Sequence, residues 1–321
     1  MAVYGGIRLF AGRGSPDLAQ EIAKYIKLPL STHDVLDFPN ENIFIRLHNS
    51  VRGQDVYVIQ NTSAPVNRNL MELLITLRTL KQDSADRVTA VVPYLCYARS
   101  DKKDQPRVPI TARLIADMIE AAGADRYIFL DLHAGQIQGF FSIPGDVLTA
   151  FHILSGYFLK IRKSLHNPVI VTADLGFAKK GRNFAERLGC SMAFIEKRRT
   201  GNKSQAMALS IVGDVKGRDV IIVDDEMDTG GTIRQAVDIV KESGGREIYL
   251  SFVHAILSEG AAGRLASLPV KEIVTTNTVP IPPEKKAMLG KRLKILSVAS
   301  LLGEVILRTH KGKSVGAMFN E

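Results

Sequence analysis

The segment Val220–Ile233, which reads VIIVDDEMDTGGTI, constrains the fold of this chain more than any other. Its first four residues are β-branched and predict a buried strand. Two acids follow the strand, and the run Asp228–Thr232 then leads into a helical pattern. Glycines let the backbone come close to a ligand, and N–H groups at a helix start face an anion. The segment therefore predicts a strand, a glycine turn and a helix that together hold a phosphate.

The side chains of this segment suit a phosphorylated sugar. The hydroxyls of Thr229 and Thr232 can add hydrogen bonds to a phosphate. The carboxylates of Asp224 and Asp225 cannot bind a phosphate directly, and they suit sugar hydroxyls or a hydrated Mg²⁺. The alternative is an ordinary strand-to-helix turn with solvated acids, which would suit a lone pair of glycines better than the full pattern.

Composition limits the classes of protein that this chain can belong to. A chain of 321 residues with 45% hydrophobic residues predicts two domains of about 150 residues each. No apolar run approaches the roughly 20 residues of a membrane span, and the N-terminus lacks the layout of a signal peptide. Cys96 and Cys190 stand in apolar segments at no metal-ligand spacing, so we expect buried free thiols in a cytoplasmic protein without a membrane partner.

The formal net charge of +9 has two interpretations. A basic chain can bind nucleic acid, but here the basic residues do not cluster with aromatic residues, tryptophan is absent and no nucleic-acid module is visible. A protein that handles several phosphate groups also needs positive charge. We therefore expect phosphorylated small molecules, and no nucleic acid, as ligands.

Short apolar runs alternate with helical patterns, which predicts an α/β fold with mainly parallel sheets. Ser15 is the expected N-cap of the first helix. Strands are predicted at Ile7–Ala11, Val56–Gln60, Val88–Val92, Tyr127–Leu132, Val169–Ala173, Met192–Ile195, Val220–Val223 and Ile248–Val253. Helices are predicted at Leu18–Lys27, Thr111–Ala122, Ala178–Leu188 and from Ile233 to about Glu242.

The domain junction is expected near Pro144–Ala150. This position predicts an N-terminal domain over residues 1–146 and a C-terminal domain over residues 147–298. Residues 299–321 carry apolar side chains at helical spacing and are expected to form a helix and tail that pack back on the first domain.

The string Asp131–Phe141, which reads DLHAGQIQGFF, carries a second functional signal. His133 follows a predicted strand and is a candidate metal or phosphate ligand, although a single histidine more often makes a structural hydrogen bond. The whole string resembles the corresponding segment of the ribose-phosphate diphosphokinases, the synthetases of 5-phosphoribosyl 1-diphosphate (PRPP). Further matches to this family are Ser50–Tyr57, Pro93–Asp104, Pro109–Ala112 and Glu196–Arg199, and the resemblance extends from Leu9 to Val315.

The resemblance implies two similar domains of the type I phosphoribosyltransferase-like fold, each a mainly parallel sheet flanked by helices. The segment around Asp228–Thr232 resembles the PRPP-binding loop of that fold. The family moves the β,γ-diphosphate of MgATP onto the C1 hydroxyl of ribose 5-phosphate, and the products are PRPP and AMP. The resemblance also implies a cytoplasmic homo-oligomer, built from dimers and expected to be a hexamer, in which neighbouring subunits share the active site.

The resemblance assigns roles to individual residues of this chain. Lys197 and Arg199 match catalytic residues on a polar loop that is expected to close over the diphosphate. The matches for ATP binding are Phe38, Asn40, Asn42, Arg99, Ser100, Asp104 and His133. The matches for ribose 5-phosphate are Asp224, Asp225, Asp228, Thr229, Gly230, Gly231 and Thr232. Asp174, Leu175 and Gly176 match the diphosphate loop, and His133 and Asp174 match ligands of Mg²⁺. Arg52, Gln138, Asp146 and Ser314 match a regulatory site that responds to phosphate and ADP.

The chain departs from the family pattern at several positions. Asn42 stands where a glutamate is usual, and Ser100 stands where a glutamine is usual. Phe177 replaces the second glycine of the diphosphate loop and would crowd a close backbone approach unless its side chain turns away. Gly316 replaces the second serine of the Ser-x-Ser ending that regulated members often carry.

Two other functions compete with the diphosphokinase. A non-catalytic relative could bind and regulate a true synthetase, and the altered diphosphate loop favours it. A phosphoribosyltransferase that consumes PRPP would share the Asp224–Thr232 loop, but it would not need Arg99, Phe38 or the His133 string. We favour the diphosphokinase because several separate segments indicate one chemistry.

Overall fold

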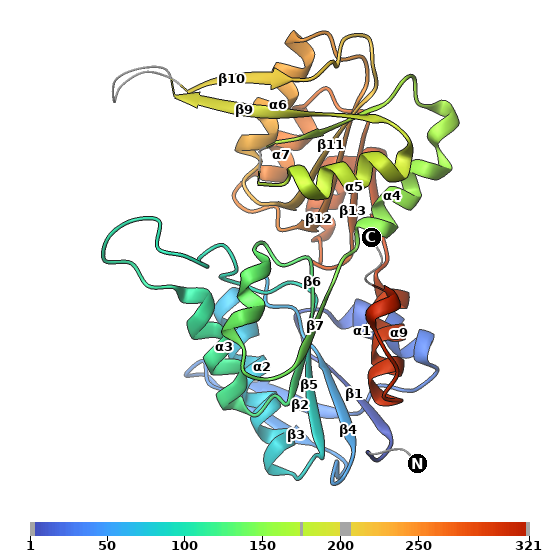
Figure 1. The fold of residues 1–321 in the computed structure, drawn as a ribbon. Helices are drawn as coiled ribbons and strands as arrows, with labels where there is room; N and C mark the ends of the chain where they lie inside the picture. The colour runs from blue at the N-terminus through green and yellow to red at the C-terminus, as the bar shows by residue number, and fades with distance from the viewer. Residues whose placement is uncertain (1–3, 174–175, 200–206, 319–321) are drawn as a thin grey trace. The chain divides into compact units, whose positions relative to one another are not determined.

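The chain forms two compact units, each built around its own sheet. The structure, a computed structural model, describes residues 4–173, 176–199 and 207–318, without the side chains of residues 197–199, 207–209 and 317 (Figure 1). Unit 1 comprises Met1–Thr149, Thr278–Pro280 and Ser297–Asn320, and unit 2 comprises Ala150–Asn277 and Ile281–Leu296. No helix in the described ranges is long and apolar enough to span a membrane.

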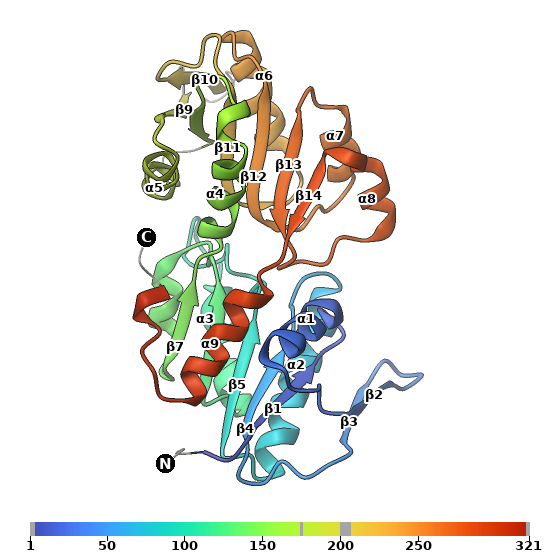
Figure 2. The ribbon, with the colours of Figure 1, turned by 90° about the vertical axis from the view of Figure 1, so that its right-hand side faces the viewer.

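The sheet of unit 1 is entirely parallel. Its strands, in spatial order, are β1 (Ile7–Ala11), β4 (Asp55–Ile59), β5 (Arg87–Val92), β6 (Arg126–Leu130) and β7 (Gly145–Leu148). The helices α1 (Pro16–Ile26) and α9 (Ala299–His310) pack together on one face, and α2 (Val66–Gln82) and α3 (Thr111–Ala122) cover the other (Figures 1 and 2). Because both faces are covered, every residue of β4 and β5 is buried.

A separate antiparallel hairpin belongs to unit 1. Its strands are β2 (His33–Asp37) and β3 (Ile43–Leu47), and Figure 2 shows it projecting from the body of the unit. Its outer residues include exposed apolar side chains, among them Leu36, Phe38 and Phe44. The hairpin was not predicted from the sequence, and it brings the turn 38–42 to the edge of the unit.

Unit 2 contains a seven-stranded sheet that is parallel except at one edge, where β9 and β10 pair antiparallel. The strands, in spatial order, are β10 (Met207–Val212), β9 (Ser191–Arg199), β8 (Val169–Thr172), β11 (Val220–Met227), β12 (Ile248–Ala255), β13 (Glu272–Thr276) and β14 (Leu293–Leu296). The helices are α4 (Phe151–Lys160), α5 (Ala178–Leu188), α6 (Gly231–Glu242), α7 (Ala261–Ser267) and α8 (Pro283–Leu289). Short 3₁₀ helices lie at Gly135–Phe140, Arg162–Ser164, Gly290–Arg292 and Gly316–Met318.

The predicted α/β class with mainly parallel sheets is confirmed, and the eight predicted strands are all present. The predicted N-cap position of Ser15 is also confirmed. Ser15 occupies the N-cap position of α1, but its side chain makes no capping hydrogen bond. Its Oγ instead accepts a hydrogen bond from the backbone N–H of Asn61 at 3.2 Å. Asn61 is buried, so its N–H needs a hydrogen-bond acceptor, and the Ser15 hydroxyl oxygen is that acceptor instead of capping the helix.

Candidate active site

The strand that precedes the glycine turn is longer than its apolar run. It was predicted to end at Val223, but β11 continues to Met227, so Asp224 and Asp225 lie within the strand. The reason is the neighbouring strand β12, which is buried along its whole length and continues the pairing to Met227. Tertiary pairing therefore overrides the low strand preference of aspartate. Asp225 is only 7% exposed in this position.

The predicted phosphate turn has the geometry of an anion site. Gly230 is the N-cap of α6 and has φ +80°, a left-handed conformation that favours glycine. Thr229, Gly231 and Thr232 are exposed at the start of this twelve-residue helix. A Cβ atom built on Gly231 would meet nothing nearer than the Thr229 Oγ1 at 3.9 Å. The start of α6 is therefore exposed, and N–H groups at such a helix start can bind an anion.

Two residues outside the turn support it. The Ser258 hydroxyl donates a hydrogen bond to Asp228 Oδ1. The Arg264 Nε donates to the backbone oxygen of Thr229 at 2.8 Å. Both supporting residues come from the segment that follows β12, and the backbone N–H of Leu257 in that segment bonds Met227 O at 2.9 Å. Sequence reasoning missed Ser258 and Arg264, because no motif marks them and only the pairing of β11 with β12 brings them to the turn.

The two carboxylates in β11 are oriented by the backbone. Asp224 Oδ1 accepts a hydrogen bond from the N–H of Asp225, and Asp225 Oδ1 accepts one from the N–H of Glu226, each at 2.9 Å. In the part of the chain that the structure describes, no group of three or more His, Cys, Asp or Glu side chains forms a protein metal site. Mg²⁺ is usually held by one or two carboxylates together with substrate phosphates, and the paired acids provide the oxygen ligands that this ion prefers.

The predicted diphosphate loop lies between β8 and α5. Asp174 and Leu175 lie outside the described residues, and Gly176 is exposed. Phe177 has a right-handed backbone with φ −91° and is 8% exposed. Its ring packs against Phe151, with a distance of 5.3 Å between the ring centroids. The side chain at the unusual position is therefore buried in unit 2, whereas Gly176 is exposed.

The predicted catalytic residues Lys197 and Arg199 end strand β9. Their backbone pairs with Leu209 and Met207 of β10. Their side chains lie outside the described part of the structure, as do residues 200–206 of the expected catalytic loop. The loop thus connects β9 and β10, the two neighbouring strands at one edge of the sheet. They form the only antiparallel pair of this sheet in the described ranges.

The predicted adenine-binding segment forms the tip of the β2–β3 hairpin in unit 1. The backbone N–H of Phe38 bonds Asn42 O at 2.9 Å, and Asn40 Oδ1 accepts the N–H of Asn42 at 3.3 Å. The Phe38 side chain is 48% exposed. A pocket of about 720 Å³ is lined by Asp37, Phe38, Glu41, Asn42, Ile43, Asn67, Arg68, Met71 and Ile75.

A cluster of charges holds the end of β2, next to the tip of this hairpin. The Arg13 guanidinium donates to both oxygens of Asp37, at 2.7 and 3.0 Å, and to Glu72 Oε2 at 2.7 Å. Glu72 lies on α2 and is 1% exposed. Arg68 also pairs with Asp37. The hydrogen bond from Arg13 lowers the pKa of the Asp37 carboxyl, so this acid stays ionised. Its contacts with Arg13 and Arg68 therefore hold the backbone directly before Phe38.

The other predicted ATP residues lie after β5 and β6. Arg99, Ser100 and Asp104 stand in the long loop between β5 and α3, and His133 stands after β6. A hydrogen bond from Gln136 Nε2 to Asp101 Oδ2 joins these two segments. They end adjacent strands of one parallel sheet and therefore share its carboxyl edge. None of these four residues is among those that line the hairpin pocket, so the predicted ATP residues of the described chain form two groups.

The predicted regulatory residues belong to three segments of unit 1. Asp146 accepts a hydrogen bond from Arg126 at 2.8 Å, and the Gln138 amide donates to Gly135 O at 3.1 Å. Ser314 Oγ accepts the N–H of Gly316 at 3.1 Å. No hydrogen bond or ion pair joins Arg52, Gln138, Asp146 or Ser314 to one another in the described structure.

Comparisons with known proteins relate both parts of the chain to the same protein family. Residues 7–123 match the model of the N-terminal domain of ribose phosphate pyrophosphokinase, and residues 200–320 match that of the phosphoribosyl synthetase-associated domain. The ribose-phosphate pyrophosphokinase of Caldanaerobacter subterraneus is 46% identical over 321 residues, which cover 99% of this chain and 100% of that protein. That of Aquifex aeolicus is 42% identical over 98% of this chain and 99% of its own length.

A solved structure shows the same fold. The crystal structure of phosphoribosylpyrophosphate synthetase from Mycobacterium smegmatis matches with a TM-score of 0.90 and 40% sequence identity, covering 96% of this chain and 100% of that one. The expected phosphoribosyltransferase-like fold with two mainly parallel sheets is thereby confirmed. Because full-length relatives are more than 40% identical to it, the chain belongs to the ribose-phosphate pyrophosphokinase family of diphosphate-transferring enzymes.

Proposed function

We propose that this chain catalyses the transfer of the β,γ-diphosphate of ATP to ribose 5-phosphate. In this reaction the C1 hydroxyl oxygen attacks the β-phosphorus, the bond from that phosphorus to the α,β-bridging oxygen breaks, the hydroxyl proton is released, and PRPP and AMP form. The observation that carries the proposal is the open turn at the start of α6, preceded by two oriented carboxylates in β11. This turn suits a phosphorylated sugar, and the similarity of the chain to ribose-phosphate pyrophosphokinases indicates which reaction it catalyses.

In unit 2 the turn 228–232 holds the 5-phosphate, and Asp224 and Asp225 hold the ribose hydroxyls. The helix N-terminus stabilises the phosphate through backbone N–H groups and the helix dipole. Asp228 shapes the turn through Ser258, and it need not contact the phosphate with its carboxylate. The exposed Gly176, with Asp174 and Leu175, contributes the diphosphate loop.

In unit 1 the loop that carries Arg99, Ser100 and Asp104 and the segment of His133 bind the phosphates of ATP. The planar guanidinium of Arg99 suits phosphate oxygens. Phe38, Asn40 and Asn42 bind adenine. The exposure of Phe38 at the tip of a projecting hairpin supports a role toward a neighbouring subunit, and we propose a homo-oligomer of dimers, with a hexamer as the expected size.

Catalysis rests on charge and position. The transition state spreads negative charge over the diphosphate, so Lys197 and Arg199 act by stabilising that charge. Mg²⁺, when bound with the nucleotide, neutralises phosphate charge, and His133 and Asp174 are the residues proposed to hold it.

Both cysteines are free, which supports a reducing compartment such as the cytoplasm. Arg52, Gln138, Asp146 and Ser314 are proposed to form a phosphate-responsive regulatory site.

The test is AMP formation from ATP, measured with and without ribose 5-phosphate and with Mg²⁺ present. AMP that depends on ribose 5-phosphate, with PRPP formed in equal amount, supports the proposed reaction. The same assay with added inorganic phosphate tests the regulatory site. Binding of both substrates without any AMP would overturn the catalytic proposal and leave a non-catalytic regulatory relative.

A further inference from the structure

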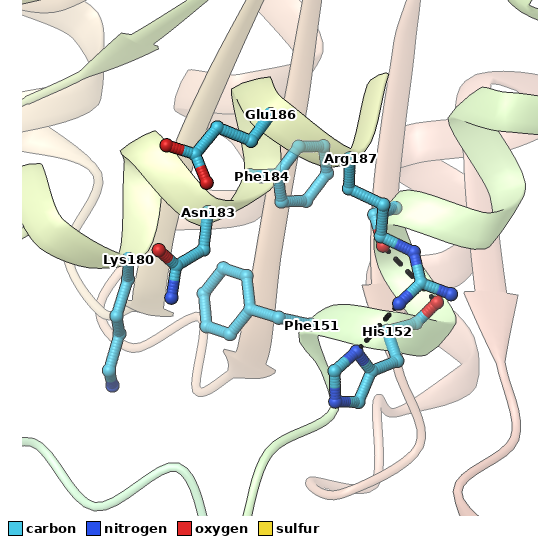
Figure 3. A pocket seen from close by; sticks show the side chains of 8 residues that line it. Phe151, His152, Lys180, Asn183, Phe184, Glu186 and Arg187 are labelled. Atoms are coloured by element: carbon cyan, nitrogen blue, oxygen red, sulfur yellow. Dashed lines mark hydrogen bonds between the residues drawn. The ribbon is translucent and has the colours of Figure 1, made fainter. Parts of the chain in front are cut away.

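A pocket between α4 and α5 in unit 2 plays no part in the proposed reaction. Its volume is about 210 Å³, and it opens between facing sides of the two helices (Figure 3). The residues that line it are Phe151, His152 and Ser155 on α4, and Lys180, Asn183, Phe184, Glu186 and Arg187 on α5.

Aromatic rings form the apolar part of the pocket. Phe151 and Phe184 are both buried, with ring centroids 6.1 Å apart and ring planes nearly perpendicular. The Lys180 Nζ lies 5.7 Å from the centroid of the Phe151 ring and 5.4 Å from that of Phe177. Such a surface favours the face or edge of another ring.

Arg187 supplies a positive charge at one end of the pocket. Its Nη1 donates a hydrogen bond to His152 Nδ1 at 2.8 Å, which places the guanidinium beside the imidazole (Figure 3). Arg187 forms no ion pair with an acid within the described ranges. The one acid of the lining, Glu186, has its carboxylate on the opposite side of Phe184 from the Arg187 guanidinium in Figure 3.

We propose that this pocket binds an aromatic anion, namely a system of one or two fused rings with a single acidic group. The rings would contact Phe151, and the acidic group would bind Arg187. A neutral ring would leave the arginine charge without an anionic partner, and an inorganic anion would leave the aromatic surface bare. Pockets for drug-sized ligands have volumes of about 300–1,000 Å³, so this smaller volume suits a compact ligand better than a whole nucleotide.

The proposal can be tested by isothermal titration calorimetry on the full chain with 1-naphthyl phosphate. Inorganic phosphate lacks the rings, and 1-naphthol lacks the charge. We expect both to bind at least about tenfold more weakly than 1-naphthyl phosphate, because each loses one of the two interactions. Equal binding of inorganic phosphate would overturn the aromatic part of the proposal, and equal binding of 1-naphthol would overturn the anionic part.

Matched variants locate the binding. Arg187→Gln removes the charge at an exposed position, and we expect it to weaken 1-naphthyl phosphate binding about tenfold or more. Arg182→Gln removes an exposed charge on the same helix outside the lining and should leave affinity unchanged. Equal affinity in the two variants, or displacement of the probe by ATP, would overturn the proposal. This outcome does not depend on whether the chain makes PRPP.

Discussion

The His310 Nδ1 lies 2.8 Å from Asp55 Oδ2, and this contact joins α9 to β4 in unit 1. Asp55 is fully buried and also accepts two hydrogen bonds from Arg87, at 2.7 and 2.8 Å. Arg87 in turn donates to the backbone oxygen of Thr309 at 3.3 Å. The buried carboxylate is thus the centre of a cluster that holds α9 against the sheet.

The first prediction concerns this cluster. Asp55→Asn removes the charge that compensates Arg87, and breaking a buried ion pair costs about 3–5 kcal/mol. We expect hydrogen exchange in α9 to accelerate by on the order of a hundredfold, measured by mass spectrometry of its peptides. Asp117→Asn is the control, because Asp117 pairs with Arg113 on an exposed helix face and should change exchange little. Similar exchange of α9 in the two variants would contradict the assigned role of Asp55.

The two cysteines should differ in reactivity. Burial raises the pKa of the Cys96 thiol to about 11, so about one thiol in a thousand is ionised at pH 8. Burial also raises the pKa of Cys190, but this residue is partly exposed. We expect iodoacetamide at pH 8 to alkylate Cys190 well before Cys96, with both rates rising as pH rises toward the pKa. Labelling of Cys96 in native Cys190→Ser protein as fast as in urea would refute this prediction.

Lys197→Ala and Arg199→Ala should each lower kcat by about a hundredfold or more with little change in KM for either substrate. The reason is that their charge is needed mostly in the transition state. This prediction rests on the family resemblance and on the backbone position of both residues at the end of β9. Arg198→Ala, between them, is the matched control. Steady-state rates of AMP formation decide the question, and an unchanged kcat in both variants would exclude the loop-closure role.

The central strands and the glycine turn could be predicted because their signals are local. Strands buried on both faces read as continuous apolar runs, and Val56–Ile59 of β4 and Val169–Val171 of β8 illustrate this. The β2–β3 hairpin could not be predicted in this way, because its charged and apolar residues are mixed without a clean alternation.

The support of the candidate site also lay beyond the sequence pattern. Ser258 lies 30 residues from Asp228 and Arg264 lies 35 residues from Thr229, and neither stands in a motif. Their role follows from the pairing of β11 with β12, because this pairing brings the segment after β12 next to the glycine turn. Likewise, the buried setting of Phe177 depends on Phe151, a residue of another helix that no local pattern connects with it.

Gly230→Ala should weaken ribose 5-phosphate binding. A left-handed backbone with a Cβ atom costs about 1 kcal/mol, and the turn can relieve that strain only by moving the N–H groups at the start of α6. Gly217→Ala is a matched control, because Gly217 also has a positive φ of 68° and open space at its Cβ position. We expect similar losses of stability in both variants but weaker ribose 5-phosphate binding, by calorimetry, only in Gly230→Ala. Equal affinities would contradict the placement of the phosphate.

Ser258→Ala tests the support of the turn from outside it. The substitution removes the hydroxyl that donates to Asp228 Oδ1 and leaves the backbone of the segment intact. A hydrogen bond of about 1 kcal/mol corresponds to about fivefold in affinity, so we expect the Kd for ribose 5-phosphate to rise by about that factor. Ser267→Ala is the control, since its hydroxyl bonds only Arg264 O near the exposed end of α7. In Asp228→Ala, where the acceptor is already gone, Ser258→Ala should have no further effect. Additive losses in the double variant would instead show that Ser258 acts independently of Asp228.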